Sequence, residues 1–309
     1  VELTGKYSGK LIFEEPFAPL LAHTIPFSPG SIISKEAYEE KGKGFGTSPV
    51  GSGPYKWVKW APEQKIVLEK FDDYYGEEPD FDRIEIYPMA EINTAEMAYE
   101  RGELDATQIS FNSVDRFKGM DDTNVKIVTP LLYEWVGFNM AKPPFDDIRV
   151  RKAVRYTINP EEIIEGAYNG YANRANTLLP PDVLGHWKDA PEYGTNLEKA
   201  RNLLDEAGYP DGFKTKIYTT NREPLPDAIT IAKYQLKKIG INAEIVLLEG
   251  GSTYEKLGKE GPPGMHYMNY GPVTFDPFRH MQWFTSGQIP GWNFLRFSNE
   301  QYDRLAEEA

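Results

Sequence analysis

The chain has 309 residues, 40% of them hydrophobic, no cysteine and a formal net charge of -13 at pH 7. This length and composition predict a folded protein with two domains. The acidic balance, without any run of Lys and Arg, argues against a nucleic-acid partner, and the missing cysteines exclude disulfides and thiolate metal sites. No apolar run approaches the ~18 residues of a membrane helix. No signal peptide is visible, and a start at Val1 is compatible with its removal.

Short strands and helices are expected to alternate through the first part of the chain. A Pro-rich passage at 16–29 cannot form a helix interior, because proline lacks the amide hydrogen. Alternating side chains from Tyr55 onward predict a hairpin with a turn at 61–64. In chain order we expect a strand at 10–14, a helix at 35–40, this hairpin, a helix at 94–101, a strand at 104–109, a helix at 114–120, and strands at 125–128 and 133–138.

Two capped helices are predicted between residues 146 and 170. Asp146 and Asp147 offer N-caps to the first helix. In the second, Asn159 can cap, Pro160 suits the first helical position, and Gly170 stops the helix. The residues at helical spacing that should form the buried face of the first helix are Val150, Ala153, Val154 and Thr157.

The second half of the chain predicts a parallel sheet with crossover helices. Thr195 and Glu198 have the spacing of a capping box, and Gly208 ends the helix that they open. A strand, a helix and a second strand in succession imply parallel pairing with a right-handed crossover. We expect strands at 214–220, 241–248 and 265–270, and helices at 226–239, 253–259, 277–284 and 302–309. Along 241–248, the alternation places Ile241, Ala243, Ile245 and Leu247 on one face.

This topology locates a candidate binding site, because ligands bind outside the carboxyl ends of parallel strands. The loop 219–226 carries Asn221 and Arg222, and the loop 270–277 carries Tyr270, Thr274 and Asp276. A third candidate is the Gly- and Pro-rich stretch 286–297. The candidates that complete the set are Trp135, Gly271, Val273, Trp292 and Asn293. The alternative is structural, with Arg222 capping a helix or pairing with a surface carboxylate and Trp292 packed in the core.

The sequence offers little support for catalysis. Neighbouring acidic residues such as Asp72 and Asp73 would point to opposite faces of a strand. The histidines lack metal-ligand spacing, and no Gly-x-Ser-x-Gly elbow occurs. We therefore predict no catalytic residue, metal ligand or cofactor. The 19 Tyr and 6 Trp indicate a site with flat stacking surfaces.

Five stretches, in order along the chain, resemble those of one protein family. They are PVGSGPY at 49–55, NMAKPPFDDIRVRKAVRYTINPEEI at 139–163, NLEKARNLLDEAGYPDGF at 196–213, YGPVTFDP at 270–277 and FSNEQYDRL at 297–305. The chain thus resembles the extracellular solute-binding proteins of ABC transporters, family 5, which bind dipeptides, oligopeptides, nickel or oligosaccharides. The resemblance implies a two-lobed α/β fold of the type II periplasmic binding proteins, with mixed sheets flanked by helices.

The resemblance also implies a domain layout, a partner and a location. Residues 1–130 would be part of lobe I. Within them, residues 1–48 would be the end of an extra subdomain and residues 49–130 the core of lobe I. Residues 131–309 would be lobe II, with a hinge near 129–140. Family members extend further at both ends, so we expect both lobes to be incomplete. The implied protein is a monomer when full length, lies in the periplasm or at the cell surface, and delivers a small solute to a membrane permease.

The solute class is left open by the residues that match the family. At Val273, family members that bind free peptides have an aspartate that pairs with the ligand amine, so a peptide held by its N-terminus is disfavoured. Tyr270 matches an aromatic position, and Arg222 matches one that holds a ligand carboxylate in dipeptide binders. A sugar and an acidic amino-acid derivative or opine-like solute are equally compatible. The alternative function is a carbohydrate hydrolase, which needs two carboxylates ~5 to 10 Å apart.

Overall fold

The computed structural model describes residues 1–27, 30–249, 255–271 and 274–308. The predicted site residue Val273 lies outside these ranges, as do residues 253–254 and 309 of two predicted helices. The chain divides into two compact units, one formed by residues 1–23 and 111–309 and the other by residues 24–110. Within the described ranges, no helix combines the length and apolar composition needed to span a bilayer.

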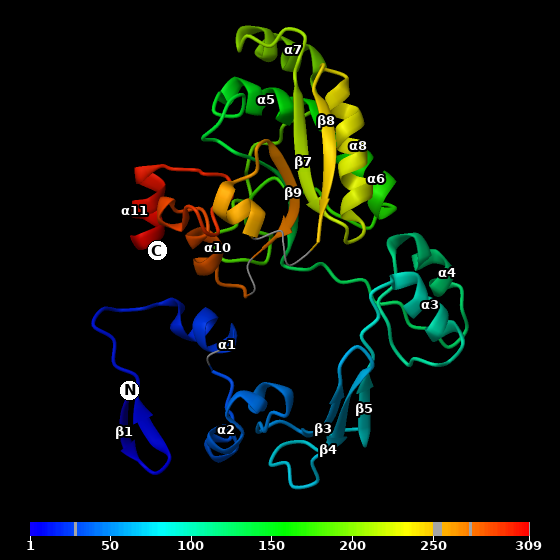
Figure 1. The fold of residues 1–309 in the computed structure, drawn as a ribbon, viewed down its shortest axis with the longest axis vertical. Helices are drawn as coiled ribbons and strands as arrows, with labels where there is room; N and C mark the ends of the chain where they lie inside the picture. Colours follow the sequence, from blue (N-terminus) through cyan, green and yellow to red (C-terminus); the bar gives the residue numbers. More distant parts are fainter. Residues whose placement is uncertain (28–29, 250–254, 272–273, 309) are drawn as a thin grey trace. The chain divides into compact units, whose positions relative to one another are not determined.

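The unit of residues 24–110 is built on a three-stranded antiparallel sheet of order β3-β4-β5 (Figure 1). The predicted hairpin is confirmed, with its turn between β3 and β4. The helix predicted at 35–40 is confirmed as α2, capped by the Ser34 side chain. The elements of this unit are α1 (Ile25–Phe27), α2 (Lys35–Lys41), a 3-10 helix (Gly42–Thr47), β3 (Tyr55–Ala61), β4 (Lys65–Lys70), β5 (Arg83–Ile86) and α3 (Ile92–Glu100).

Three predicted strands are wrong. Residues 104–109 form no strand, and the following Ser110 N–H donates instead to the buried Glu96 carboxylate at 2.7 Å. Residues 125–128 are largely exposed and form no strand. Residues 11–14 also form none, because the strand pairing of this region lies earlier, between β1 (Glu2–Gly5) and β2 (Ser8–Lys10). Short apolar runs become strands only where a partner strand satisfies their backbone groups.

A four-stranded sheet of order β6-β9-β7-β8 forms the centre of the other unit. Its strands are β6 (Tyr133–Phe138), β7 (Lys214–Thr220), β8 (Asn242–Leu248) and β9 (Met265–Tyr270). Strand β7 pairs in parallel with β8 and β9, which confirms the predicted crossover topology. Strand β6 runs antiparallel to β9. At the edge strand β8, Ala243 and Ile245 pack into the core of the helices, Leu247 at the strand end is exposed, and Leu248 is buried in another cluster, with Met268 and Phe294.

Most helices of this unit agree with the predictions. The helices are α4 (Val114–Lys118), α5 (Ile148–Thr157), α6 (Pro160–Tyr168), α7 (Leu197–Glu206), α8 (Leu225–Lys237), α10 (Phe278–Gln282) and α11 (Glu300–Glu308). Shorter turns are π-helical at Leu20–Thr24 and Lys256–Glu260 and 3-10 at Phe111–Ser113 and Ser286–Gln288. The buried face predicted for α5 is confirmed.

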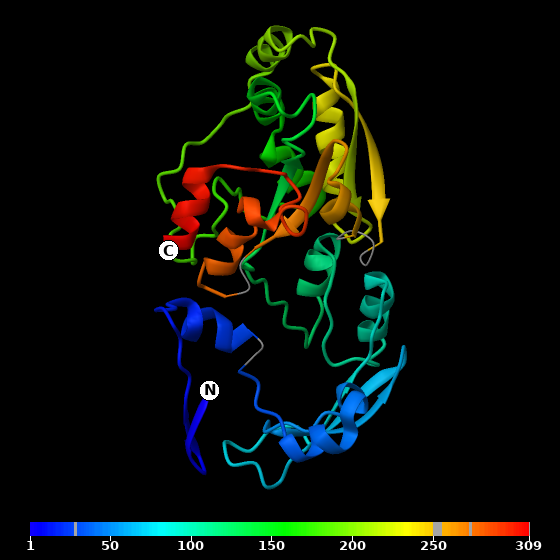
Figure 2. The same cartoon turned by 60° about the vertical axis from the view of Figure 1, so that its left-hand side comes forward.

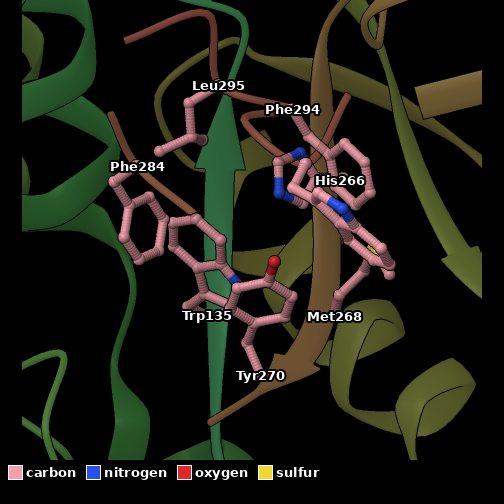
Figure 3. Close-up of a pocket in the computed structure, with 8 residues that line it drawn as sticks. Trp135, His266, Met268, Tyr270, Phe284, Phe294 and Leu295 are labelled. Atoms are coloured by element: carbon pink, nitrogen blue, oxygen red, sulfur yellow. The ribbon is translucent and has the colours of Figure 1, made fainter. Parts of the chain in front are cut away.

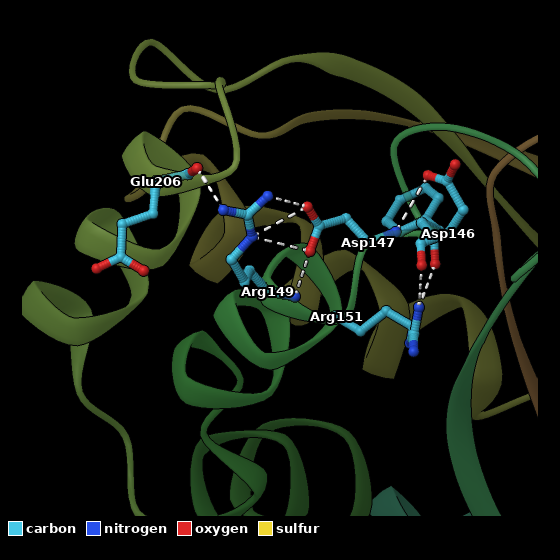
Figure 4. Close-up of polar contacts among 6 residues, drawn as sticks. Asp146, Asp147, Arg149, Arg151 and Glu206 are labelled. Atoms are coloured by element: carbon cyan, nitrogen blue, oxygen red, sulfur yellow. Dashed lines mark hydrogen bonds and ion pairs between the residues drawn. The ribbon is translucent and has the colours of Figure 1, made fainter.

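The capped start of α5 also ties that helix to α7 (Figure 4). Asp147 is the cap, and its carboxylate accepts the Arg149 N–H at 2.7 Å. The Arg149 guanidinium pairs with the same carboxylate and donates to the carbonyl of Glu206 at 2.6 Å, at the end of α7. Arg151 donates to the carbonyl of Asp146 at 2.9 Å. Asp147 therefore fixes both the first turn of α5 and the side chain that reaches α7.

The cap predicted for α7 is off by one residue. Asn196, rather than Thr195, accepts the Lys199 N–H at 2.9 Å through its side chain. Asn196 also donates its backbone N–H to the carbonyl of Tyr156 at 2.7 Å. This second bond holds the cap residue against the end of α5, which explains why the helix starts at Leu197.

The two faces of the four-stranded sheet are covered differently (Figures 1 and 2). Helices α5, α6 and α8 pack on one face, which we call the helical face, and α7 packs on α5. The segment 283–302, which includes the start of α11, covers the other face, which we call the aromatic face. The helical face is centred on fully buried aliphatic and aromatic side chains, namely Phe145, Val150, Ile217, Ile229 and Leu236. The aromatic face carries Tyr133, Tyr270, Phe284 and Leu295 in its core.

Candidate functional site

The carboxyl ends of β7 and β9 meet at one edge of the sheet, because these strands pair in parallel. The loop that follows β7 carries Asn221 and Arg222, and both are exposed. Strand β9 ends at Tyr270, which is buried. The structure thus places Arg222 and Tyr270 at the same end of the sheet, as the topology predicted from the sequence requires.

A small aromatic pocket lies on the aromatic face behind this edge (Figure 3). Strand alternation puts His266, Met268 and Tyr270 of β9 on the same face, and Trp135 comes from the neighbouring β6. The segment 283–295 supplies the outer wall. The residues that line the pocket are Trp135, His266, Met268, Tyr270, Phe284, Trp292, Phe294 and Leu295. The pocket therefore brings together three predicted site residues, Trp135, Tyr270 and Trp292.

Aromatic rings connect this pocket to the surface. The Tyr270 and Trp283 ring centroids lie 3.9 Å apart, and those of Trp283 and Trp292 lie 5.9 Å apart at 20°. Trp292 is 40% exposed, so the outer end of this row reaches solvent. At the inner end, Trp135 meets His266 edge to face, with centroids 5.3 Å apart. The exposed Trp292 ring at the outer end offers a flat surface to an apolar or ring-shaped group.

His266 is the polar residue buried deepest in this pocket. Its side chain is fully buried, and burial lowers the pKa of His266 to about 4, so the ring is neutral at pH 7. The ring lies against Gly137 of β6, where an added Cβ would meet its Cε1 and Nε2 atoms at 2.2 Å. Among the described residues, neither ring nitrogen of His266 nor the Trp135 Nε1 has a hydrogen-bond partner. Unpaired buried polar groups are rare in folded proteins.

The predicted residues Thr274 and Asp276 lie in the loop after β9, close to His23 of the N-terminal segment. The Thr274 hydroxyl lies 3.0 Å from Nδ1 of His23. Asp276 precedes α10, and its carboxylate accepts the N–H of Phe278, the first residue of that helix, at 2.9 Å. Burial lowers the pKa of His23, and the nearby Asp276 carboxylate partly offsets that effect. Thr274 and Asp276 are half-buried and do not line the aromatic pocket.

Two further predicted residues have clear structural roles. An added Cβ at Gly271 would meet the Leu131 carbonyl oxygen at 1.9 Å, so this position needs glycine. Asn293 is fully buried, and its amide nitrogen donates to the carbonyls of Phe284, Thr285 and Phe297. Its side-chain oxygen accepts the Phe297 N–H at 3.1 Å. These bonds hold the covering loop, and solute binding by either residue stays a prediction.

The opposite, helical face carries a half-buried carboxylate that the sequence analysis did not single out. Glu134 of β6 accepts hydrogen bonds from the hydroxyls of Tyr168 and Tyr267, the latter at 2.8 Å. Desolvation raises the pKa of Glu134, and the two hydroxyls oppose that shift. The period of β6 could have placed Glu134 opposite Trp135, but only the fold shows which tyrosines reach it. No group of three potential metal-binding side chains occurs in the described ranges.

The sequence matches a family model described as "Bacterial extracellular solute-binding proteins, family 5 Middle" over residues 1–292. The glutathione-binding protein GsiB of Salmonella paratyphi A is 28% identical over 98% of this chain and 60% of its own length. The chain therefore spans less than two thirds of the length of this relative.

Solved structures share the fold. The periplasmic binding protein DppA of Helicobacter pylori, in complex with the peptide STSA, is 28% identical, with a TM-score of 0.82 over 96% of this chain and 59% of its own. A dipeptide-binding protein of Pseudoalteromonas, in complex with Met-Leu, is 25% identical, with a TM-score of 0.77 over 89% of this chain and 57% of its own. These matches confirm the predicted type II α/β architecture. The chain belongs to the bacterial extracellular solute-binding proteins of family 5.

Proposed function

We propose that this chain is the solute-binding part of an ABC importer. It captures a small solute at the carboxyl edge of β7 and β9 and delivers it to a membrane permease, working in the periplasm or at the cell surface. The family match supports this proposal, as do relatives that are named as glutathione- and peptide-binding proteins. The proposal assigns no catalytic step.

The observation that carries the proposal is the shared edge of β7 and β9. Arg222 is exposed in the loop after β7, and the aromatic row from Tyr270 to Trp292 begins at the end of β9. A guanidinium binds carboxylates through two parallel hydrogen bonds, and stacked rings bind flat or apolar groups. Together they suit a solute with a carboxylate and an uncharged body.

A peptide-like acid is the solute class that we propose. Glutathione and the peptides in the names of the relatives all carry carboxylates, to which the Arg222 guanidinium would donate hydrogen bonds. Val273 cannot pair with an ammonium, so we expect the solute amine to be held elsewhere or to be absent. An oligosaccharide is a second candidate, favoured by the solvent-exposed Trp292 ring. A hydrolase gains no support from the relatives, which are named as binding proteins.

Calorimetric titration of the full-length protein tests the proposal. Glutathione, Met-Leu, an opine acid and an oligosaccharide are titrated against the wild type, Arg222→Ala and Lys214→Ala. We expect a carboxylate-bearing solute to bind and Arg222→Ala to weaken it at least about tenfold, or ~1.4 kcal/mol. Lys214 lies at the amino end of β7, so its substitution should leave the affinity unchanged. Failure of the whole panel to bind would contradict the proposed function, and equal losses in both variants would contradict the role of Arg222.

A further inference from the structure

Polar groups from two strands converge on the aromatic pocket. The Trp135 indole of β6 and the His266 imidazole of β9 lie edge to face, with centroids 5.3 Å apart. Figure 3 shows the Tyr270 hydroxyl pointing between these two rings. The other lining side chains are apolar apart from the Trp292 indole at the exposed end. The pocket thus has an apolar wall and a polar inner end.

Within the described residues, the Trp135 and His266 nitrogens at this inner end have hydrogen-bonding capacity that the protein leaves unused. In the part of the chain that the structure describes, the Trp135 Nε1–H donor and both His266 ring nitrogens lack partners. A neutral imidazole always presents one donor and one acceptor, whichever tautomer it adopts. Buried groups of this kind are normally satisfied by the protein or by ordered water. Cavities that stay dry are lined by apolar groups alone.

The size of the space fits one small molecule. The cavity measures about 10 Å³, which is close to the lower limit of roughly 10–15 Å³ that one water needs. A carboxylate, a sugar ring or an amino-acid side chain is far too large to enter without moving the walls. The cavity is also uncharged at pH 7, because burial lowers the pKa of His266 to about 4, so it offers nothing to compensate an ion.

We propose that a single buried water binds between Trp135, His266 and Tyr270. The water accepts the Trp135 Nε1–H and donates to the unprotonated nitrogen of His266, with the Tyr270 hydroxyl as a third neighbour. Buried waters typically make about three hydrogen bonds, and the Trp135 and His266 nitrogens supply two of them. This site does not depend on the identity of the solute. It links β6 to the strand that ends at the proposed solute edge, and it holds the Trp135 ring in one orientation.

High-resolution crystallography and magnetic relaxation dispersion of water nuclei test this inference on the full-length protein without added solute. The crystal structure should show a density peak within hydrogen-bonding distance of the Trp135 Nε1 and one His266 nitrogen. Relaxation dispersion counts waters with long residence times, and Trp135→Phe should lose one of them relative to the wild type. Met268→Leu is the matched control, because Met268 lines the same pocket without a hydrogen-bonding nitrogen or hydroxyl group, and it should keep the count.

The outcomes separate clearly even if one variant folds poorly, since the wild-type density needs no substitution. An empty pocket in the crystal, with unchanged dispersion in Trp135→Phe, would overturn the inference. So would a wild-type structure in which Trp135 donates directly to a protein atom. A copurified solute atom in the peak would also overturn it, whereas failure of every solute in the titration panel would leave the water site standing.

Discussion

The two faces of the β6-β9-β7-β8 sheet are built from different side chains although they share the same strands. Glu134 and Trp135 are neighbours in β6, yet Glu134 bonds to two tyrosine hydroxyls on the helical face and Trp135 lines the aromatic pocket. In β9, Tyr267 and His266 divide in the same way. The half-buried Glu134 carboxylate of the helical face is paired, whereas the Trp135 and His266 nitrogens of the aromatic face have no partner among the described residues. We propose that the helical face mainly stabilises the fold, whereas the aromatic face lies behind the proposed solute edge.

The sharpest test of this division is a substitution that leaves a large cavity on the helical face. Phe145 is almost fully buried, with its ring 5.3 Å from Phe138 and 5.7 Å from Phe213. We expect Phe145→Ala to lower the free energy of unfolding by about 4 kcal/mol, because it removes buried area and leaves a cavity. Denaturant titration measures the loss. The affinity of the folded variant for its solute should be unchanged, and a parallel loss of affinity would break the division.

The aromatic face should dominate the response to acid. A histidine with a folded pKa of about 4 stabilises the fold above its unfolded pKa of 6.5, and this stability is lost as the pH falls toward 4. Protonation of His266 should therefore lower the free energy of unfolding by about 3 kcal/mol over that interval. His280, whose pKa burial also lowers to about 4, acts in the same direction. Unfolding of the wild type and His266→Leu at pH 7 and pH 4 measures the difference, and the variant should lose clearly less stability.

The helical face should respond to acid with the opposite sign. Because desolvation raises the pKa of Glu134, its neutral form suits the folded state, and its effect on stability improves as the pH falls. Glu134→Gln keeps an acceptor oxygen and removes the titration. Between pH 7 and pH 4, the loss of unfolding free energy should be larger in Glu134→Gln than in the wild type and smaller in His266→Leu. This result would assign opposite pH responses to the two faces. Identical pH profiles in both variants would contradict these assignments.

A smaller effect is expected where β6 touches His266. An alanine at Gly137 would place its Cβ 2.2 Å from the imidazole and 2.9 Å from Leu295 Cδ2. We expect Gly137→Ala to cost about 2 kcal/mol, as overpacked cores typically do. In a double-mutant cycle with His266→Ala, the cost should shrink, because the crowded ring is gone. Strictly additive losses would show that the imidazole does not hold this position against β6.

The sequence predicted the strands of this sheet better than the pocket that they carry. Strands β6, β7 and β9 occupy the predicted ranges because their β-forming runs also pair with partner strands. Residues 104–109 and 125–128 are similar short runs, but without a partner strand they form none. The strand-end loops followed from parallel topology alone. The pocket did not, because its outer wall comes from residues 283–295, whose folding over His266 has no local sequence signal.

The smallest expected effect shows which of two residues caps the start of α7. The spacing of Thr195 and Glu198 predicts a capping box, whereas in the structure Asn196 accepts the Lys199 N–H. Asn196→Ala should therefore cost about 1 kcal/mol, the usual worth of an N-cap, and Thr195→Ala should cost clearly less. Denaturant titration of both variants measures this. Because α7 packs behind the helical face, solute affinity should stay unchanged in both, and the reverse order of stabilities would restore Thr195 as the cap.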